Sequence, residues 1–290
     1  MKPPPFEYRA PTSVEEALDL LWEHGDEARP LAGGQSLVPL MALRLARPSL
    51  LVDLAGVAGL DAIGSANGSV TVGAMVRERA AERSAEIAGS APLLAAALPL
   101  IGHPAIRSRG TVGGSLSHAD PAGELPAVAL AAEAVMVARS HQGERTIPAA
   151  DFFTGYFSTA LAPDELLTEV RWPEAADGSG AAFEEVARRH GDFAMVGVAA
   201  MVSLEAGKIT SARLALSGVS DTPVRAGDAE AALVGVAPGD EAFGEAAQLA
   251  AAALSPPSDL HGSSAYRRHV AGVLVRRALA VAVARAQGSR

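Results

Sequence analysis

The chain contains no cysteine in its 290 residues, so it can form no disulfide, no thiolate nucleophile and no cysteine-ligated zinc or iron–sulfur site. Positive charge is also scarce, because 24 Lys and Arg residues stand against 33 Asp and Glu residues, a net charge of -9. Proteins that hold nucleic acid neutralise its phosphates with clustered Lys and Arg. The composition therefore excludes several metal and redox sites within this chain and argues against a nucleic-acid partner.

Long hydrophobic runs are missing as well. The longest stretch without a charged residue, 87–106, is interrupted by Pro92, Pro99 and Pro104. Because proline breaks a helix interior, we expect short buried pieces here and no transmembrane segment. The N-terminal Met1-Lys2-Pro3-Pro4-Pro5 lacks the apolar core of a secretory signal, so we expect a cytoplasmic protein.

Familiar catalytic motifs are absent too. The sequence has no Gly-x-Gly-x-x-Gly fingerprint, no P-loop, no His-Glu-x-x-His and no Gly-x-Ser-x-Gly. His118-Ala119-Asp120 brings a histidine and a carboxylate together, either as an acid–base or metal pair or, more commonly, to cap a helix or fix a loop. If the chain belongs to an enzyme, we expect a bound cofactor to supply the chemistry.

Alternating strands and helices are predicted in the first fifty or so residues. Ser13-Val14-Glu15-Glu16 is a capping box that begins a helix, and Gly25 is placed to end it. Apolar segments 29–32 and 50–53 predict buried strands, with a helical pattern over 37–45 between them. This βαβαβ order favours a small parallel sheet.

Hairpins and antiparallel strands dominate the rest of the chain. Asn67-Gly68 predicts a tight hairpin turn, because both positions favour positive φ, and residues 141–143 predict a second one. After a linker-like break at 175–180, three strands are expected over 183–187, 194–204 and 209–216, followed by alanine-rich helices that end in a basic helix over 267–285. The fold class is α+β.

Two glycine pairs are the most informative motifs. They are Leu31-Ala32-Gly33-Gly34-Gln35-Ser36-Leu37 and Gly110-Thr111-Val112-Gly113-Gly114-Ser115-Leu116. Glycine lets a phosphate approach the backbone, so two such loops can hold the two phosphates of one dinucleotide. The alternative is that each pair only makes a tight turn.

Charged residues flank the second pair, and each has two interpretations. Arg107 and Arg109 either bind or steer an anion or are solvated loop charges. Asp120 and Glu124 either cap a helix that begins near residue 122 or accept hydrogen bonds from a ribose or ribityl chain. The residues themselves leave both questions open.

Taken together, residues 32–37, 110–115 and Asp120-Pro121 resemble the FAD-binding medium subunit of the molybdenum hydroxylases, the xanthine dehydrogenase and carbon monoxide dehydrogenase family. The resemblance runs from Phe6-Glu7-Tyr8 to the C-terminal helices and includes Arg188-Arg189 with Gly191-Asp192-Phe193-Ala194. It implies a two-lobed FAD-binding domain of the vanillyl-alcohol-oxidase (PCMH) type over 1–176, with lobes of about 1–57 and 58–176. A C-terminal medium-subunit domain with a three-stranded antiparallel sheet and helices would follow over 177–290.

The same resemblance implies a set of FAD contacts but no catalytic residue and no metal ligand. The glycine segments would cradle the pyrophosphate, Ile101 would lie against the adenine, Glu124 would be the acidic contact, Leu167 would line the flavin site and Phe193 would approach the isoalloxazine. The full set is Leu31, Ala32, Gly33, Gly34, Gln35, Ser36, Leu37, Ile101, Thr111, Val112, Gly113, Gly114, Ser115, Asp120, Glu124, Leu167 and Phe193.

Two positions depart from the family pattern. Glu185 stands where the family usually has a lysine, and its negative charge would disfavour an anionic reduced flavin. Phe193 stands where the carbon monoxide dehydrogenase pattern has a tyrosine, so a phenolic hydrogen bond would be missing.

The resemblance implies an electron-transfer subunit. A molybdopterin large subunit would oxidise the substrate, and [2Fe-2S] clusters of a small subunit would pass the electrons to FAD here, for release to NAD, a quinone or O2. The absence of cysteine agrees with clusters that reside in a partner. Two alternatives are a self-contained FAD-dependent oxidase of a small alcohol and a cofactor-free scaffold of the same fold.

Overall fold

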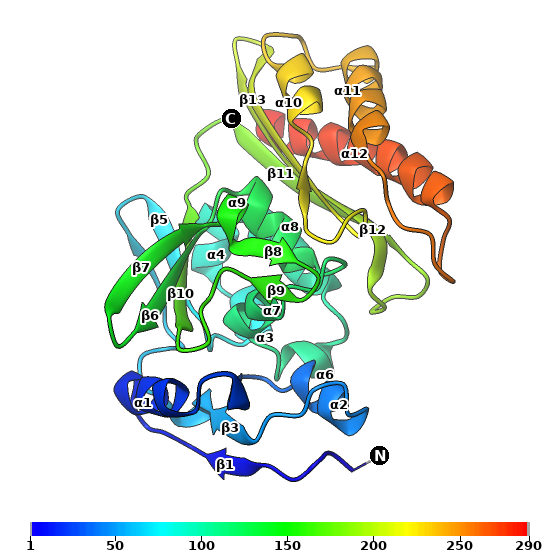
Figure 1. Ribbon diagram of the computed structural model, residues 1–290. Helices are drawn as coiled ribbons and strands as arrows, with labels where there is room; N and C mark the ends of the chain where they lie inside the picture. Colours follow the sequence, from blue (N-terminus) through cyan, green and yellow to red (C-terminus); the bar gives the residue numbers. More distant parts are fainter. Residues whose placement is uncertain (1, 289–290) are drawn as a thin grey trace.

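The computed structural model describes residues 2–288, which form three parts stacked in chain order (Figure 1). The first part holds a parallel sheet of order β1-β3-β2, made of β1 (Glu7–Arg9), β3 (Leu50–Asp53) and β2 (Ala28–Leu31). Helices α1 (Val14–His24) and α2 (Leu37–Ala42) connect its strands. The predicted βαβαβ order is confirmed, and the Ser13 hydroxyl accepts a hydrogen bond from the Glu16 amide at the start of α1.

The second part is built on a five-stranded antiparallel sheet of order β4-β5-β10-β6-β7. Its strands are β4 (Ile63–Ala66), β5 (Ser69–Gly73), β10 (Leu166–Pro173), β6 (Val135–Ser140) and β7 (Gly143–Pro148). Asn67 and Gly68 have φ angles of 53° and 72°, as the predicted hairpin requires. Two short strands, β8 (Phe153–Gly155) and β9 (Ser158–Thr159), form a separate hairpin after α9 (Ala149–Phe152).

Short helices surround that sheet, and proline decides where two of them begin. Pro92 is the first residue of α5 (Pro92–Ala97) and Pro104 is the first of α6 (Pro104–Arg107). The others are α3 (Glu78–Glu82), α4 (Ala85–Ser90), α7 (Val112–His118) and α8 (Glu124–Ala131). The uncharged stretch 87–106 is thus divided as expected, and no helix within residues 2–288 combines the length and apolarity needed to cross a membrane.

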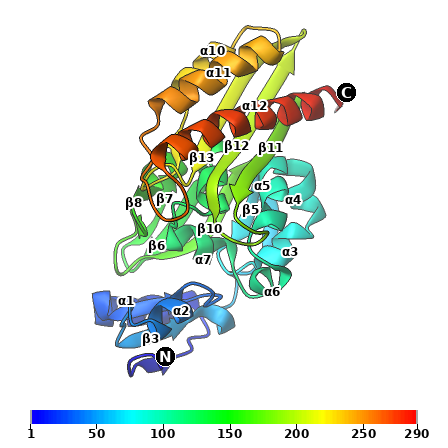
Figure 2. The ribbon, with the colours of Figure 1, turned by 90° about the vertical axis from the view of Figure 1, so that its right-hand side faces the viewer.

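The third part is a four-stranded antiparallel sheet of order β11-β12-β13-β14. The three expected strands are β11 (Ser179–Ala187), β12 (Ala194–Glu205) and β13 (Lys208–Ser217). A further strand, β14 (Val224–Arg225), has only two residues, too few to produce an alternating pattern in the sequence. Helices α10 (Gly227–Leu233), α11 (Asp240–Ala253) and α12 (Ser264–Gly288) cover one face of this sheet (Figure 2).

The opposite face of that sheet packs on α5 and α8 of the second part. Alternation along β11 explains this: Ala182 points into the cluster under α10–α12, whereas Ala181 and Phe183 join the hydrophobic core of the second part. The second and third parts therefore share a core, and this fixes the loop between β11 and β12 beside the site described next.

Candidate cofactor site

A cleft of about 740 Å³ lies where the three parts of the chain meet. The first part contributes the loop before α2, the second contributes the start of α7 and the start of α8, and the third contributes the loop 191–193. The cleft brings together every predicted FAD contact except Leu31 and Val112: Ala32, Gly33, Gly34, Gln35, Ser36, Leu37, Ile101, Thr111, Gly113, Gly114, Ser115, Asp120, Glu124, Leu167 and Phe193.

The first glycine segment offers free backbone donors to the cleft. Within residues 2–288, none of the four N–H groups from Gly33 to Ser36 donates to another protein group. Gly34 has a φ of 73°, in the left-handed region that favours glycine. Successive amides with one residue in this region form a concave site for an anion. The interpretation of this segment as a phosphate loop therefore has a geometric basis beyond the tight turn.

The second glycine segment is arranged differently, because its amides are already bonded. The N–H groups of Val112 and Gly113 donate to the carbonyls of Val76 and Ala74, at 3.0 and 2.9 Å, and the Gly114 N–H donates to the Thr111 hydroxyl at 3.0 Å. A Cβ atom on Gly113 would overlap Ala74. Gly113 therefore permits close packing against Ala74, and Val112 is fully buried in the core. Ser115 lines the cleft.

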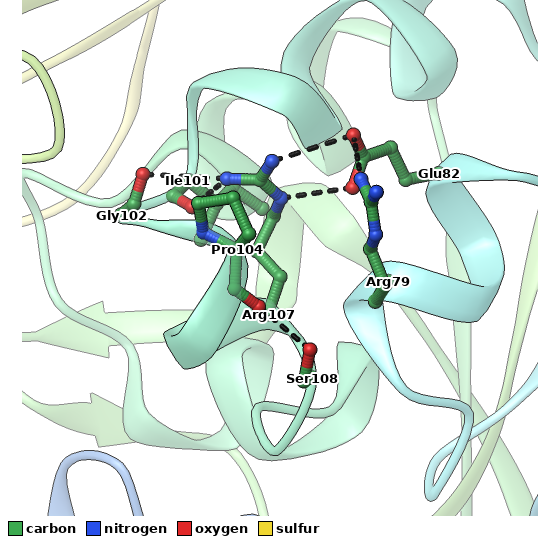
Figure 3. Close-up of polar contacts among 7 residues, drawn as sticks. All are labelled: Arg79, Glu82, Ile101, Gly102, Pro104, Arg107 and Ser108. Atoms are coloured by element: carbon green, nitrogen blue, oxygen red, sulfur yellow. Dashed lines mark hydrogen bonds and ion pairs between the residues drawn. The ribbon is translucent and has the colours of Figure 1, made fainter.

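Arg107 fits neither interpretation suggested by the sequence. Its side chain is 5% exposed and makes a hydrogen-bonded ion pair with Glu82, at 2.9 and 3.3 Å, so it is neither a solvated charge nor a group free to bind an anion. Its Nη1 also donates to the carbonyls of Ile101 and Gly102, at 2.9 and 3.3 Å (Figure 3). Arg107 therefore holds in place the loop that presents Ile101 to the cleft.

Arg109 is exposed and lies beside the first glycine segment, so the structure is compatible with both interpretations suggested by the sequence. It borders a second cavity of about 390 Å³ together with Gly33, Gly34 and Arg77. Leu31 lines this second cavity and not the main cleft. The Arg77 guanidinium donates to the Arg109 carbonyl, which ties the residue before α3 to the chain that leads into the second glycine segment.

Asp120 and Glu124 both line the cleft, and Asp120 also makes a local hydrogen bond with its side chain. Its Oδ1 accepts a hydrogen bond of 2.9 Å from the Ala122 amide and so fixes the turn that precedes α8. Glu124 is the first residue of α8 and is 5% exposed. Burial raises the pKa of the Glu124 carboxyl to about 7, and the nearby Asp120 charge adds to this effect.

Two further carboxyls with raised pKa values lie close to Glu124. Burial and the Glu124 charge raise the pKa of Glu78 to about 8 and that of Glu185 to about 7. Glu78 lines the cleft and is a site residue that the sequence did not reveal, since an acidic residue at a helix start is common on any surface. Glu185 does not line the cleft, and its raised pKa reduces the negative charge expected there at neutral pH.

Aromatic residues form the rim of the cleft. Phe193 and Phe157 are 62% and 56% exposed, and the His118 ring packs on Phe157 with centroids 5.0 Å apart. Burial lowers the pKa of His118, which favours a neutral ring at pH 7. His103 stacks on His190 at 6.0 Å and so connects the loop that carries Ile101 to the loop that carries Phe193. Across residues 2–288, His, Asp and Glu side chains form no cluster suited to a metal ion.

Comparison with known proteins identifies the family to which the chain belongs. Residues 4–175 match the family described as the FAD binding domain in molybdopterin dehydrogenase, and residues 181–282 match the CO dehydrogenase flavoprotein C-terminal domain. The chain belongs to the FAD-binding medium subunits of the molybdenum hydroxylase family. It is therefore an oxidoreductase subunit with an FAD-binding domain of the two-lobed, mixed α/β type.

Individual relatives resemble the chain over nearly its whole length. The 6-hydroxypseudooxynicotine dehydrogenase complex subunit alpha of Paenarthrobacter nicotinovorans is 44% identical over 100% of this chain and 98% of its own. The carbon monoxide dehydrogenase medium chain of Hydrogenophaga pseudoflava is 40% identical over 98% of this chain and 99% of its own. A solved structure of carbon monoxide dehydrogenase from that organism, which lacks the Mo-pyranopterin moiety of the molybdenum cofactor, matches with a TM-score of 0.96 and 42% identity over 98% of this chain and 99% of that chain.

Proposed function

We propose that this medium subunit holds FAD in the cleft and conveys electrons between a partner's iron–sulfur clusters and an external acceptor. FAD, when bound, supplies the one- and two-electron redox chemistry. The substrate would be oxidised on a molybdopterin-bearing large subunit, and the clusters would belong to a small subunit. The acceptor would be NAD, a quinone or O2, and the hetero-oligomer would work in the cytoplasm.

The observation that carries this proposal is the row of free amides from Gly33 to Ser36 at the wall of the 740 Å³ cleft. Consecutive free N–H groups can donate hydrogen bonds to the oxygens of a diphosphate. The volume of the cleft lies in the range typical of ligand and cofactor pockets. Ser115 faces the same space, while Ile101 and Leu167 supply apolar surface for ring systems. We therefore assign the predicted contacts that line the cleft to FAD, with Leu31 and Val112 as supporting residues behind them.

The tasks of the chain are then to bind, orient and shield FAD. Arg107 fixes the Ile101 loop, and the stacked His103 and His190 connect this loop to the one that carries Phe193. We propose that residues 1–176 form the FAD-binding domain, with lobes of about 1–57 and 58–176, and that residues 177–290 form the C-terminal domain.

Substrate choice, in this proposal, belongs to the large subunit. Two relatives that cover almost all of the chain at 44% and 40% identity bear the names of dehydrogenases for 6-hydroxypseudooxynicotine and for carbon monoxide. The two names denote very different compounds. A medium subunit that never touches the substrate explains why such similar chains serve such different reactions.

The decisive experiment uses the full chain, purified, incubated with FAD and then separated from free FAD. We expect stoichiometric flavin to be retained and to be released on denaturation. Co-expression with the partner subunits should allow the complex's substrate to reduce the flavin, whereas simple alcohols should leave the flavin of the isolated chain oxidised. Failure to retain added FAD would favour the scaffold, and reduction of the isolated chain by an alcohol would favour a self-contained oxidase.

A further inference from the structure

Glu78 is a buried carboxyl on the wall of the cleft with no protein partner for one of its oxygens. The residue is 3% exposed, and its Oε2 makes no hydrogen bond within residues 2–288. This oxygen lies against the start of the second glycine segment, since a Cβ atom on Gly110 would be 2.5 Å from it. The carboxyl is thus placed beside the backbone that closes on Gly33 and its free amides.

Two donors near Glu78, the Gly110 N–H and the Arg107 guanidinium, are already engaged. The Gly110 N–H donates to the carbonyl of Ile106 at 2.7 Å, and the Gly110 carbonyl accepts from the Glu78 N–H at 3.0 Å. Arg107, the cation that affects Glu78, gives its hydrogen bonds to Glu82, Ile101 and Gly102. An orphaned polar atom of this kind costs free energy unless a ligand or water satisfies it.

Burial, assisted by one of the two charges that face it, keeps Glu78 in its protonated form. Burial has the largest effect on its pKa, the carboxyl of Glu124 on α8 adds to it, and Arg107 on α6 acts against both, for a value of about 8. Asp120 raises the pKa of Glu124 in turn. Arg79 and Glu82, on the same helix as Glu78, are paired with each other at 2.6 Å. At neutral pH, Glu78 therefore carries a proton that it can donate.

We propose that Glu78 is an FAD-binding residue that donates a hydrogen bond from its protonated carboxyl to an oxygen of the cofactor's diphosphate. The proposal rests on FAD being the occupant of the cleft. A carboxylate would repel the diphosphate, but a carboxylic acid binds it, so the affinity for FAD depends on one proton. No motif in the sequence marks this contact, because only the fold brings residue 78 to the second glycine segment.

Affinity for FAD as a function of pH tests the proposal, with the full chain and FAD fluorescence as the readout. For the wild-type chain, the Kd should rise about tenfold between roughly pH 7 and pH 9, as expected for a required proton on a group with a pKa of about 8. Glu78→Gln keeps a donor that cannot ionise, so it should retain the neutral-pH affinity and lose most of this rise. Glu78→Met keeps the volume without a donor and should weaken binding roughly tenfold or more even at neutral pH.

Glu86→Gln is the matched control, since it removes one carboxyl from the neighbouring helix α4 outside the cleft. It should bind FAD as the wild type does at every pH. Circular dichroism of each variant establishes that it is folded. The inference is overturned if Glu78→Met binds as tightly as the wild type, or if Glu78→Gln keeps the full pH dependence. Loss of binding in the wild type itself would instead contradict the proposed function.

Discussion

A Cβ atom on Gly33 would overlap the carbonyl oxygen of Arg109. The two glycine segments, far apart in the sequence, thus touch backbone to backbone at the wall of the cleft. Any side chain at position 33 would force them apart and widen the site. Replacing Gly33 by alanine, which adds only a methyl group, therefore tests this backbone contact.

Gly33→Ala should destabilise the chain by about 1–3 kcal/mol, because backbone atoms must shift to admit the methyl group. It should also weaken retention of FAD. Urea unfolding followed by circular dichroism gives the first quantity, and released flavin gives the second. Gly244→Ala, in the middle of α11 with nothing within 4 Å, is the control and should stabilise the chain by about 0.5–1 kcal/mol. Equal effects of the two substitutions would contradict the close contact.

Arg107→Met should lower both stability and affinity for FAD. The variant leaves Glu82 and the carbonyls of Ile101 and Gly102 without their buried donor, at a cost of about 2–4 kcal/mol in unfolding free energy. Arg79→Met removes the more exposed partner of Glu82 and should cost less than about 1 kcal/mol. If both variants retain FAD equally well, Arg107 does not order the Ile101 loop.

The stability of the apo chain should fall as the pH rises from mildly acidic to alkaline. A carboxyl whose folded pKa is raised stabilises the fold below its unfolded pKa, and this contribution is lost as the pH rises through the folded value of about 7 for Glu185. Glu185→Gln should thus be more stable than the wild type at about pH 9 and not at about pH 5. Thermal melts at both pH values test this, and a pH-independent difference would show that Glu185 is not desolvated.

Arg267→Met should destabilise the C-terminal part by about 2–4 kcal/mol. Its Nη1 donates to the carbonyls of Met195 and Gly218, at 2.6 and 2.9 Å, and its Nη2 bonds Asp259 at 2.7 Å. Arg276→Met, on the same helix but 54% exposed and 3.9 Å from Asp240, should change stability by less than about 0.5 kcal/mol. Comparable losses in urea unfolding would contradict a structural role specific to Arg267.

Local signals predicted much of the fold, because they act over a few residues. The capping box at Ser13, the Asn67-Gly68 turn and the apolar segment 194–204 each specify an element without reference to the rest of the chain. The two-residue β14 escaped prediction, since its pairing with β13 depends on tertiary contacts.

The site was predictable only where a motif marks it. The glycine pairs identified the wall of the cleft, but their different roles depend on hydrogen bonds to residues 74–76, which the sequence does not indicate. The sequence offered an anion-binding group or a solvated loop charge for Arg107, and missed its ion pair because the partner Glu82 lies on another helix. Glu78 gave no signal, since burial of a carboxyl is a property of the folded chain.

The shared core under the C-terminal sheet makes the second and third parts one folding unit. Ala181, Phe183 and Ala199 are buried against α5 and α8, not against helices of their own part. Cutting the chain between residues 173 and 179 would expose the apolar face of the sheet on the C-terminal fragment. It would also expose the apolar surfaces of α5 and α8 on the N-terminal fragment. The two halves should therefore unfold in a single cooperative transition, and neither should persist as a soluble fragment after proteolysis.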